Sequence, residues 1–391
     1  VFVGDVSTIA TYCVVSATLT AVISCCAQVF GRVTGLVDRP DGQRKTHEVD
    51  TPLIGGLALL VPSFAVSIVY LSLVAHAPFM VTAVAAASLM LIIGLADDLT
   101  GISPVWRLLM MMFLVFTTFS IEPIFVLHTL RLGVAGFSSA ISLDPVAAPV
   151  TALVILGFIN ASNMADGMNG QLLGSIMIWC LFIALHLGLD TALPFIAVIC
   201  SAGVTIIFNL RGRLFSGSSG AYAASLFIAL GAIAAYRRGD GAVPAEMPLY
   251  WFWLPIVDCA RLMVTRVLAG RSPLSGDRNH FHHMLHERGR MRYALIVYLG
   301  MLAAPGAAAE ISSTLGSVVL LVCLAGYAAF VVARELRRAD PAWPGAVASL
   351  ASLFSRQAQG APQLSAAMAA PRAPDIALQN TAQQANPTAG N

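Results

Sequence analysis

Two adjacent carboxylates, Asp97 and Asp98, are the side chains of this sequence with the clearest capacity for chemistry. They close an apolar run that begins near Val81. Such a run is typical of a membrane helix, so we expect both acids where that helix meets water. Two like charges side by side repel each other, and a divalent cation or a shared proton relieves the repulsion. The pair is therefore a candidate for metal binding or base chemistry, with two solvated acids at a helix end as the alternative.

A second polar run lies at 160–170 and ends in glycine. Its polar side chains recur every three residues, at Asn160, Asn163, Asp166 and Asn169. In a helical turn this spacing places them on roughly one side. Gly167 and Gly170 predict that a helix breaks into a loop here, at the membrane surface. An ordinary Asn/Gly turn is the alternative interpretation.

Basic groups suited to phosphate occur in two further loops. Lys45 is the only lysine in the chain, and its compact ammonium group suits a phosphate. His47 and the turn that ends at Gly55-Gly56 follow it, although a simple positive anchor is an alternative. In the other loop, four of the eight histidines fall within seven residues, at His280, His282, His283 and His286. A zinc site is an alternative, but no cysteine is near, and imidazoles beside Arg278 suit a phosphate or nucleotide better.

Two weaker signals remain. Residues 211–221 are rich in glycine and serine next to a helix start, which could cradle a phosphate but is more typical of a flexible connection. Asp258 and Arg261 are three residues apart inside an apolar run. A charged residue within a membrane span is a functional candidate by default, but this spacing favours a structural ion pair.

Composition indicates what must position these groups. With 58% hydrophobic and 11% charged residues, the chain is predicted to be an all-α integral membrane protein. A formal charge of +2 gives no basic surface for nucleic acid. Runs of about 20 apolar residues predict eleven transmembrane helices, give or take one. They lie near 6–30, 53–75, 79–96, 105–120, 146–161, 171–189, 191–209, 220–236, 249–268, 293–309 and 313–333.

The distribution of basic residues predicts the orientation, because short cytoplasmic loops collect arginine and lysine. One set of alternate loops is much richer in them, with Arg32, Arg39, Arg44, Lys45, Arg107, Arg211, Arg213, Arg271, Arg278, Arg288, Arg290 and Arg292, against Arg131, Arg237 and Arg238 in the other set. The N-terminus is therefore expected outside, and all five polar loops on the cytoplasmic face. Residues 121–145 are predicted to form an outer loop with room for a small hairpin. We expect one membrane domain over 1–336 and a disordered cytoplasmic tail over 337–391.

Together these motifs resemble the polyprenyl-phosphate N-acetylhexosamine-1-phosphate transferases of glycosyl transferase family 4, and most closely the enzymes of the UDP-GlcNAc:undecaprenyl-phosphate type. The resemblance extends from about residue 6 to 333. Besides Asp97-Asp98 and the 160–170 run, it rests on Val37-Asp-Arg-Pro40 with Lys45 and His47, on Pro52-Leu-Ile-Gly-Gly56, and on Ser272-Pro-Leu-Ser-Gly-Asp-Arg-Asn-His-Phe-His-His283.

This resemblance implies transfer of a sugar 1-phosphate from a UDP-N-acetylhexosamine to undecaprenyl phosphate, with release of UMP. The expected cofactor is Mg²⁺, or Mn²⁺ in its place, and the expected location is the cytoplasmic face of a bacterial inner membrane. The reaction would begin a cell-surface glycan such as O-antigen. Asp97 and Asp98 would be catalytic and hold the metal, while Lys45, His47, Asn160, Asn163, Asp166, Asn169, Arg278, His280, His282 and His283 would bind substrates. Whether the protein is a homodimer is left open.

Three residues depart from the family pattern. Ser218, in Phe215-Ser-Gly-Ser-Ser-Gly220, stands where the family has a metal-binding aspartate. Asn169 replaces a second family aspartate, and Gly101 replaces an acid found in some members. The first departure raises an alternative, an impaired paralogue that binds lipid phosphate or a partner. A membrane transporter is a more remote alternative. It predicts polar residues near the bilayer midplane and an inverted repeat, whereas nearly all the candidate residues here lie in loops on one side.

Overall fold

The structure is a computed structural model that describes residues 6–39, 50–134, 137–238, 243–272, 279–287 and 290–337. All of these belong to one compact unit, Val1–Asp340. Lys45, His47 and Arg278 lie outside the described residues, as does the predicted tail from residue 338 onward.

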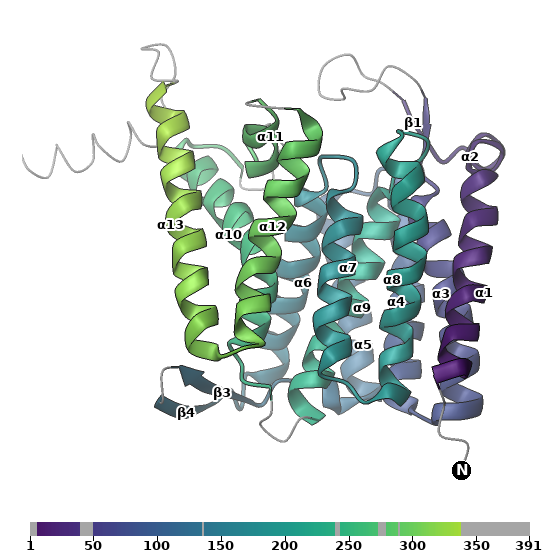
Figure 1. Cartoon of the computed structure of the whole chain (residues 1–391), viewed down its shortest axis with the longest axis horizontal. Coiled ribbons are helices and arrows are strands. Elements are labelled where there is room, and N and C mark those ends of the chain that lie inside the picture. The colour runs from purple at the N-terminus through teal and green to yellow at the C-terminus, as the bar shows by residue number, and fades with distance from the viewer. Residues whose placement is uncertain are drawn as a thin grey trace, which may run out of the picture. The chain divides into compact units, whose positions relative to one another are not determined.

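Long helices running side by side form almost all of the described structure (Figure 1). They are α1 (Val6–Cys25), α3 (Gly55–Tyr70, continued by the π-helical turn η1, Leu71–Ala75), α4 (Pro78–Thr100), α5 (Pro104–Ile121), α6 (Ala147–Ala165), α7 (Gln171–Leu185), α8 (Leu189–Leu210), α9 (Gly217–Arg238), α10 (Met247–Leu268), α12 (Met291–Ala309) and α13 (Ser313–Arg337). The prediction of an all-α membrane protein is confirmed.

Each of the eleven ranges expected from the sequence overlaps one of these helices. Among the described residues, nine helices are long and apolar enough to cross a membrane. The two others are α7, which has only 15 residues, and α10, which carries Asp258, Arg261 and Arg266 among its apolar residues. How many helices cross the membrane, and in which direction, stays a prediction.

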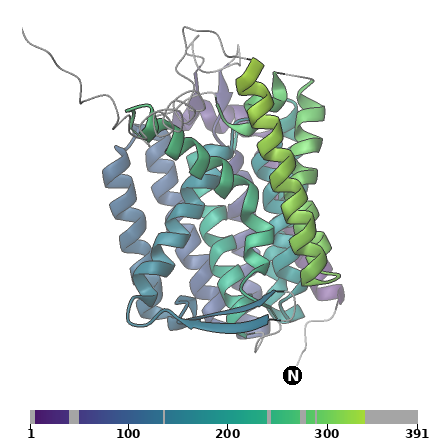
Figure 2. The same ribbon diagram turned by 90° about the vertical axis from the view of Figure 1, so that its left-hand side faces the viewer.

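Short elements mark the two ends of the bundle. The helix α2 (Ala27–Thr34), the pair β1 (Val37–Asp38) and β2 (Thr51–Pro52), and the helix α11 (Phe281–His286) lie at one end (Figure 1). At the opposite end, β3 (Thr129–Val134) pairs antiparallel with β4 (Phe137–Ser142), from Thr129 opposite Ser142 to Val134 opposite Phe137 (Figure 2). The hairpin predicted within 121–145 is therefore confirmed. The 3₁₀ turn η2 (Pro123–Phe125) precedes it.

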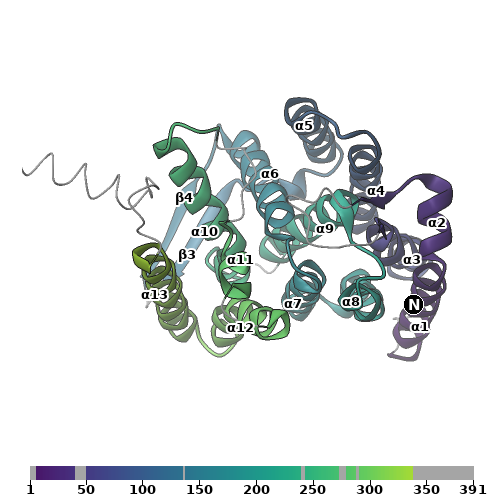
Figure 3. The same cartoon turned by 90° about the horizontal axis from the view of Figure 1, so that it is seen from above.

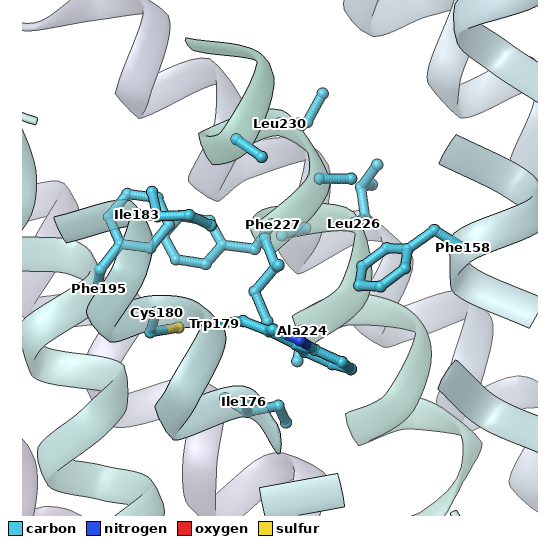
Figure 4. Close-up of a cluster of buried hydrophobic side chains, with 14 of the residues drawn as sticks. Phe158, Ile176, Trp179, Cys180, Ile183, Phe195, Ala224, Leu226, Phe227 and Leu230 are labelled. Carbon is cyan, nitrogen blue, oxygen red and sulfur yellow. The ribbon is translucent and has the colours of Figure 1, made fainter. Parts of the chain in front are cut away.

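Helix α9 is the centre of the packing, with other helices around it (Figure 3). In its most apolar stretch, 94% of the residues are buried. A helix that is apolar on all sides is expected in the core of a bundle. Phe227 of α9 stacks on Phe195 of α8 with ring centroids 4.4 Å apart, and Trp179 packs nearby against Phe158 at 5.2 Å (Figure 4). This core fixes where α9 begins, next to the last turn of α4.

Candidate functional site

The carboxylate of Asp98 is held by the first turn of α9. Its Oδ1 accepts a hydrogen bond from the Ser218 amide at 2.8 Å, and its Oδ2 accepts one from the Ser219 amide at 3.0 Å. Amides at a helix N-terminus lack partners within the helix and lie at the positive end of its dipole. A Cβ on Gly217 would come within 2.5 Å of the Asp98 carboxylate, so this close approach requires glycine there. Asp98 therefore caps α9 from a different helix.

Asp97, on the same turn of α4, is held by side chains instead. Its Oδ2 accepts hydrogen bonds from the Tyr222 hydroxyl at 2.9 Å and from Arg107 Nη1 at 3.2 Å. The Arg107 guanidinium also lies 5.5 Å from the Tyr222 ring centroid. Asp97 is 9% exposed, so its charge is compensated inside the protein rather than by water. Both adjacent acids are thus fixed in place.

The first and fourth polar loops meet beside these acids. The Gly55 amide donates to the Phe215 carbonyl at 2.8 Å, and the Phe215 amide donates to the Pro52 carbonyl at 2.8 Å. A Cβ on Gly56 would come within 2.4 Å of the Gly220 nitrogen. The turn that ends in Gly55-Gly56 therefore packs directly on the 215–220 segment. The glycines predicted to permit close backbone approach do so.

The third loop contributes Asp166 where α6 ends. The predicted break is confirmed, because α6 stops at Ala165 and Asp166 has a non-helical backbone. Of the four polar residues at three-residue spacing, only Asn160 and Asn163 lie in the helix. Asn160 is turned back on its own helix, since its Nδ2 donates to the Leu156 carbonyl at 2.7 Å. Asn163 and Asn169 are half-buried and make no side-chain hydrogen bond within the part of the chain that the structure describes.

Asn209, near the end of α8, joins this loop to the fourth. Its Oδ1 accepts a hydrogen bond from the Gly170 amide, and its Nδ2 donates to the Leu214 carbonyl at 2.9 Å. The side chain is 5% exposed, so both bonds are shielded from water. One buried amide thus fixes the third loop relative to the segment that precedes α9.

His282 brings the fifth loop to the third. A Cβ on Gly167 would come within 1.9 Å of His282 Nε2, so the imidazole lies directly against this glycine. His282 is 1% exposed, and neither of its ring nitrogens has a hydrogen-bond partner among the described residues. Burial, and then the neighbouring His283 and His280, hold the pKa of His282 well below its ordinary value. The ring is therefore neutral at pH 7.

The other histidines of this loop lie beside it. His280 stacks on His282 with ring centroids 5.5 Å apart and an angle of 13°, and its Nδ1 lies 2.9 Å from Asp258 Oδ2. The centroids of His282 and His283 are 4.1 Å apart, and His283 is half-buried. The predicted ion pair of Asp258 and Arg261 is confirmed, with 2.8 Å between Oδ1 and Nη2.

Asp166 differs from the other acids of the site. Burial raises its pKa to about 7, and the nearby charge of Asp98 contributes to the shift. No hydrogen bond or ion pair to its side chain occurs within the described part of the chain. Two mutually repelling carboxylates without a cation between them are the arrangement that a hard divalent ion relieves. The third and second loops are thus linked electrostatically.

These acids fit an open magnesium site rather than a closed one. Among the described residues, no group of three histidine, cysteine or acidic side chains converges to hold a metal. Mg²⁺ is usually bound by one or two carboxylates together with substrate phosphates, so Asp98 and Asp166 could hold it. Asp97, expected as a ligand, is instead engaged by the cation of Arg107. Ser218 brings a hydroxyl and an amide, but no carboxylate, to the same place.

Known proteins share this sequence pattern. The profile of glycosyl transferase family 4 matches residues 80–236. Proteins named undecaprenyl-phosphate alpha-N-acetylglucosaminyl 1-phosphate transferase are similar, at 28% identity in Yersinia pestis and 27% in Escherichia coli K12. The alignments cover 69% and 80% of this chain, and 75% and 89% of those proteins. A decaprenyl-phosphate N-acetylglucosaminephosphotransferase of Mycolicibacterium smegmatis is 28% identical over 74% of this chain and 79% of its own length.

The profile and these relatives are those of the polyprenyl-phosphate hexosamine-1-phosphate transferase family, and they support a phosphoglycosyl transferase by class. The stretch matched by the family profile contains Asp97, Asp98, Asp166 and Ser218, whereas Lys45 and the histidine run lie outside it. The contact between Gly167 and His282 is what brings the histidine run to the matched stretch.

Three residues that shape this family site were not assigned to it from the sequence. Arg107 was interpreted only as a marker of the cytoplasmic side, and Asp258 only as an ion-pair partner. Tyr222 was given no role, although a phenol four residues after Ser218 in an apolar helix is a usable signal. Helical spacing places it one turn beyond the start of α9, toward the same neighbour, α4.

Proposed function

We propose that this transferase moves a sugar 1-phosphate from a UDP-N-acetylhexosamine, with UDP-GlcNAc as the first candidate, to undecaprenyl phosphate and releases UMP. The observation that carries the proposal is the convergence of Asp98, Asp166 and His282 at one end of the bundle. The side chains of two of these groups, Asp166 and His282, have no hydrogen-bond partner among the described residues. The names of the similar proteins support an N-acetylglucosaminyl 1-phosphate group and a polyprenyl phosphate acceptor.

The chain's own residues would do two things with anionic substrates. Asp97 or Asp98 would orient or deprotonate the phosphate of the acceptor lipid, at a position fixed by α9 and Arg107. His282 is neutral and could donate one hydrogen bond to a donor phosphate without a change of charge. Asn163 and Asn169 would line the nucleotide-sugar pocket, together with Asp166.

Mg²⁺ would be held by Asp98 and Asp166 and, when bound, would neutralise the charge that develops on the departing UMP. Lys45, His47 and Arg278 would add positive charge around the phosphates. We place this site on the cytoplasmic face of the inner membrane, where the arginine-rich loops are expected. The long lipid tail would lie between helices in the bilayer, with only its phosphate at the site.

The experiment uses membranes that contain the full chain. They are incubated with undecaprenyl phosphate, Mg²⁺ and one UDP-sugar at a time, and UMP and the lipid product are measured by mass spectrometry. We expect UMP and an undecaprenyl diphosphate sugar in equal amounts with at least one UDP-N-acetylhexosamine. No lipid product with any UDP-sugar would overturn the proposal.

Ser218 favours one competing function, an inactive relative that binds lipid phosphate. A neutral hydroxyl stands there, so among the described residues the local negative charge comes from Asp98 and Asp166, with Asp97 paired to Arg107 beside them. The variant Ser218→Asp separates the two. If the proposal is right, the parent is active and the variant changes its rate or its Mg²⁺ requirement. If the parent is inactive and Ser218→Asp gains transfer activity, the competing function is correct.

A further inference from the structure

A buried carboxylate behind the histidine run has no role in the function proposed above. Asp258 of α10 is 3% exposed and accepts hydrogen bonds from three elements. The donors are Arg261 Nη2 at 2.8 Å, the Tyr327 hydroxyl at 2.8 Å, His280 Nδ1 at 2.9 Å and the Phe281 amide at 3.2 Å. Such saturation is what a buried carboxylate needs in order to remain charged.

The contact with His280 has a direct chemical consequence. A carboxylate only accepts hydrogen bonds, so Nδ1 of His280 must carry the proton in this contact. The other ring nitrogen, Nε2, is then the atom that remains for further bonding. Nε2 has no hydrogen-bond partner in the described part of the chain. Asp258 therefore determines both the direction of the His280 ring and which of its nitrogens is available.

A chain of ring contacts connects His280 to the candidate site. His280 stacks on His282, which in turn lies against Gly167 beside Asp166. The helix α11 that carries these rings has only six residues, too few to hold a shape without tertiary contacts. Asp258 fixes its start through the Phe281 amide as well as through His280.

A second ion pair, between a buried arginine and an exposed glutamate, holds the other end of α11. Arg334 of α13 is 4% exposed and donates to Glu287 from Nε at 3.0 Å and from Nη2 at 2.9 Å. The Glu287 amide donates to the His283 carbonyl at 3.0 Å, as at an ordinary helix end, but no hydrogen bond that the structure describes joins the Arg334 side chain to a histidine. It therefore serves as a control for effects that come only from loosening α11.

We propose that Asp258 is a positioning residue of the transferase, which holds the His280 imidazole so that Nε2 faces a phosphate of the nucleotide-sugar donor. The inference rests on the proposed function. Arg261 and Tyr327 support it indirectly, since Arg261 Nε also donates to the Tyr327 hydroxyl at 2.7 Å and both side chains donate to Asp258. Asp258 itself touches no reacting atom.

Kinetics of single and double variants test this role. Removing a group that orients a histidine typically costs about 10- to 100-fold in activity. We expect Asp258→Asn and His280→Gln each to lower kcat/KM for the UDP-sugar by at least about 10-fold. The double variant should be no worse than His280→Gln alone, because Asp258 acts through that ring. By contrast, the losses of kcat/KM caused by Arg334→Gln and His280→Gln should multiply when the two are combined. A double variant much worse than His280→Gln would overturn the proposal.

A spectroscopic measurement separates this inference from the proposed function. In the purified full chain labelled with ¹⁵N-histidine, NMR should show the His280 proton on Nδ1, and Asp258→Asn should remove this preference. Assignment uses the His280→Gln spectrum. A parent protein with the proton only on Nε2 would overturn the inference whether or not the protein is active. A parent with the Nδ1 proton but no transfer activity would contradict only the proposed function.

Discussion

The two adjacent acids at the end of α4 and the pair formed by Asp166 and His282 occupy the same end of the bundle but have opposite surroundings. Asp97 and Asp98 receive four hydrogen bonds from α5 and α9. His282 is buried and Asp166 is half-buried, and neither receives a side-chain hydrogen bond within the described residues. The first pair is held by hydrogen bonds from the protein, whereas the second lacks them.

This difference indicates which side chains the fold sets in advance and which ones a ligand completes. A buried polar group without a partner costs about 1–3 kcal/mol, so it is rare where nothing binds. His282 carries that cost in full and the half-buried Asp166 carries part of it, on two loops far apart in the sequence. Substrate and metal would supply what they lack. The fixed acids would then act on a ligand whose position the second pair determines.

Gly167→Ala should have the largest effect, because it disturbs the contact between the third loop and His282. The added Cβ needs the space of His282 Nε2, and that buried ring cannot move without leaving its stacked neighbours. A displacement of about 1 Å in a substrate-positioning group can cost about 100-fold, and we expect such a loss in kcat/KM. The matched control is Gly157→Ala on α6, where a Cβ would meet open space. Equal activity of the two variants would show that the contact is not needed.

Asp166→Asn and Asp98→Asn should change the stability of the protein in opposite directions. The folded pKa of Asp166 is about 7, above its ordinary 3.8, so the parent is most stable when this carboxyl is protonated. That stability is present below about pH 4 and is lost as pH rises through 7. In buffer without Mg²⁺, the variant should therefore melt above the parent at pH 8, with a difference that shrinks toward pH 4. Asp98→Asn should instead melt below the parent, because its amide nitrogen would face an amide donor of α9. A lower melting temperature for Asp166→Asn at pH 8 would refute the distinction.

Tyr222→Phe should have the smallest effect of the three. It removes one of the two hydrogen bonds to Asp97 and leaves the contact with Arg107, for a cost of about 1 kcal/mol. We expect a slightly lower melting temperature and about a fivefold lower kcat. Tyr236→Phe at the other end of α9 removes a phenol that donates to the Thr129 carbonyl and accepts from the Arg131 amide, and should lower stability alone. If both variants kept full activity, Asp97 would not need its tyrosine.

Much of this arrangement could be predicted from composition and local pattern. Apolar runs located the helices, and Gly167 and Gly170 located the end of α6, because both signals are local. The Gly55-Gly56 turn was rightly expected to allow a close backbone approach. The contact of Asp258 with Arg261 also followed from helical spacing alone.

The rest depends on contacts between distant segments. Nothing at Asp98 shows that its carboxylate caps a helix that starts about 120 residues later. Nor does the sequence show that the His280 ring contacts Asp258 of another helix. The position of Arg107 next to a loop suggested only the membrane orientation. The three-residue spacing from Asn160 to Asn169 suggested one polar face, but the helix ends before Asp166, so the shared face covers only its first half.

The most direct test of the account compares UMP release by the parent with that by Asp98→Asn, in membranes with equal amounts of each protein, undecaprenyl phosphate, a UDP-N-acetylhexosamine that the parent uses, and Mg²⁺. Asp97→Asn is measured beside it, and Asp144→Asn, an exposed acid at the other end of the bundle, is the control. We expect Asp98→Asn to release UMP more than about 100-fold more slowly than the parent, and Asp144→Asn to match the parent. Full activity in both Asp97→Asn and Asp98→Asn would contradict the account.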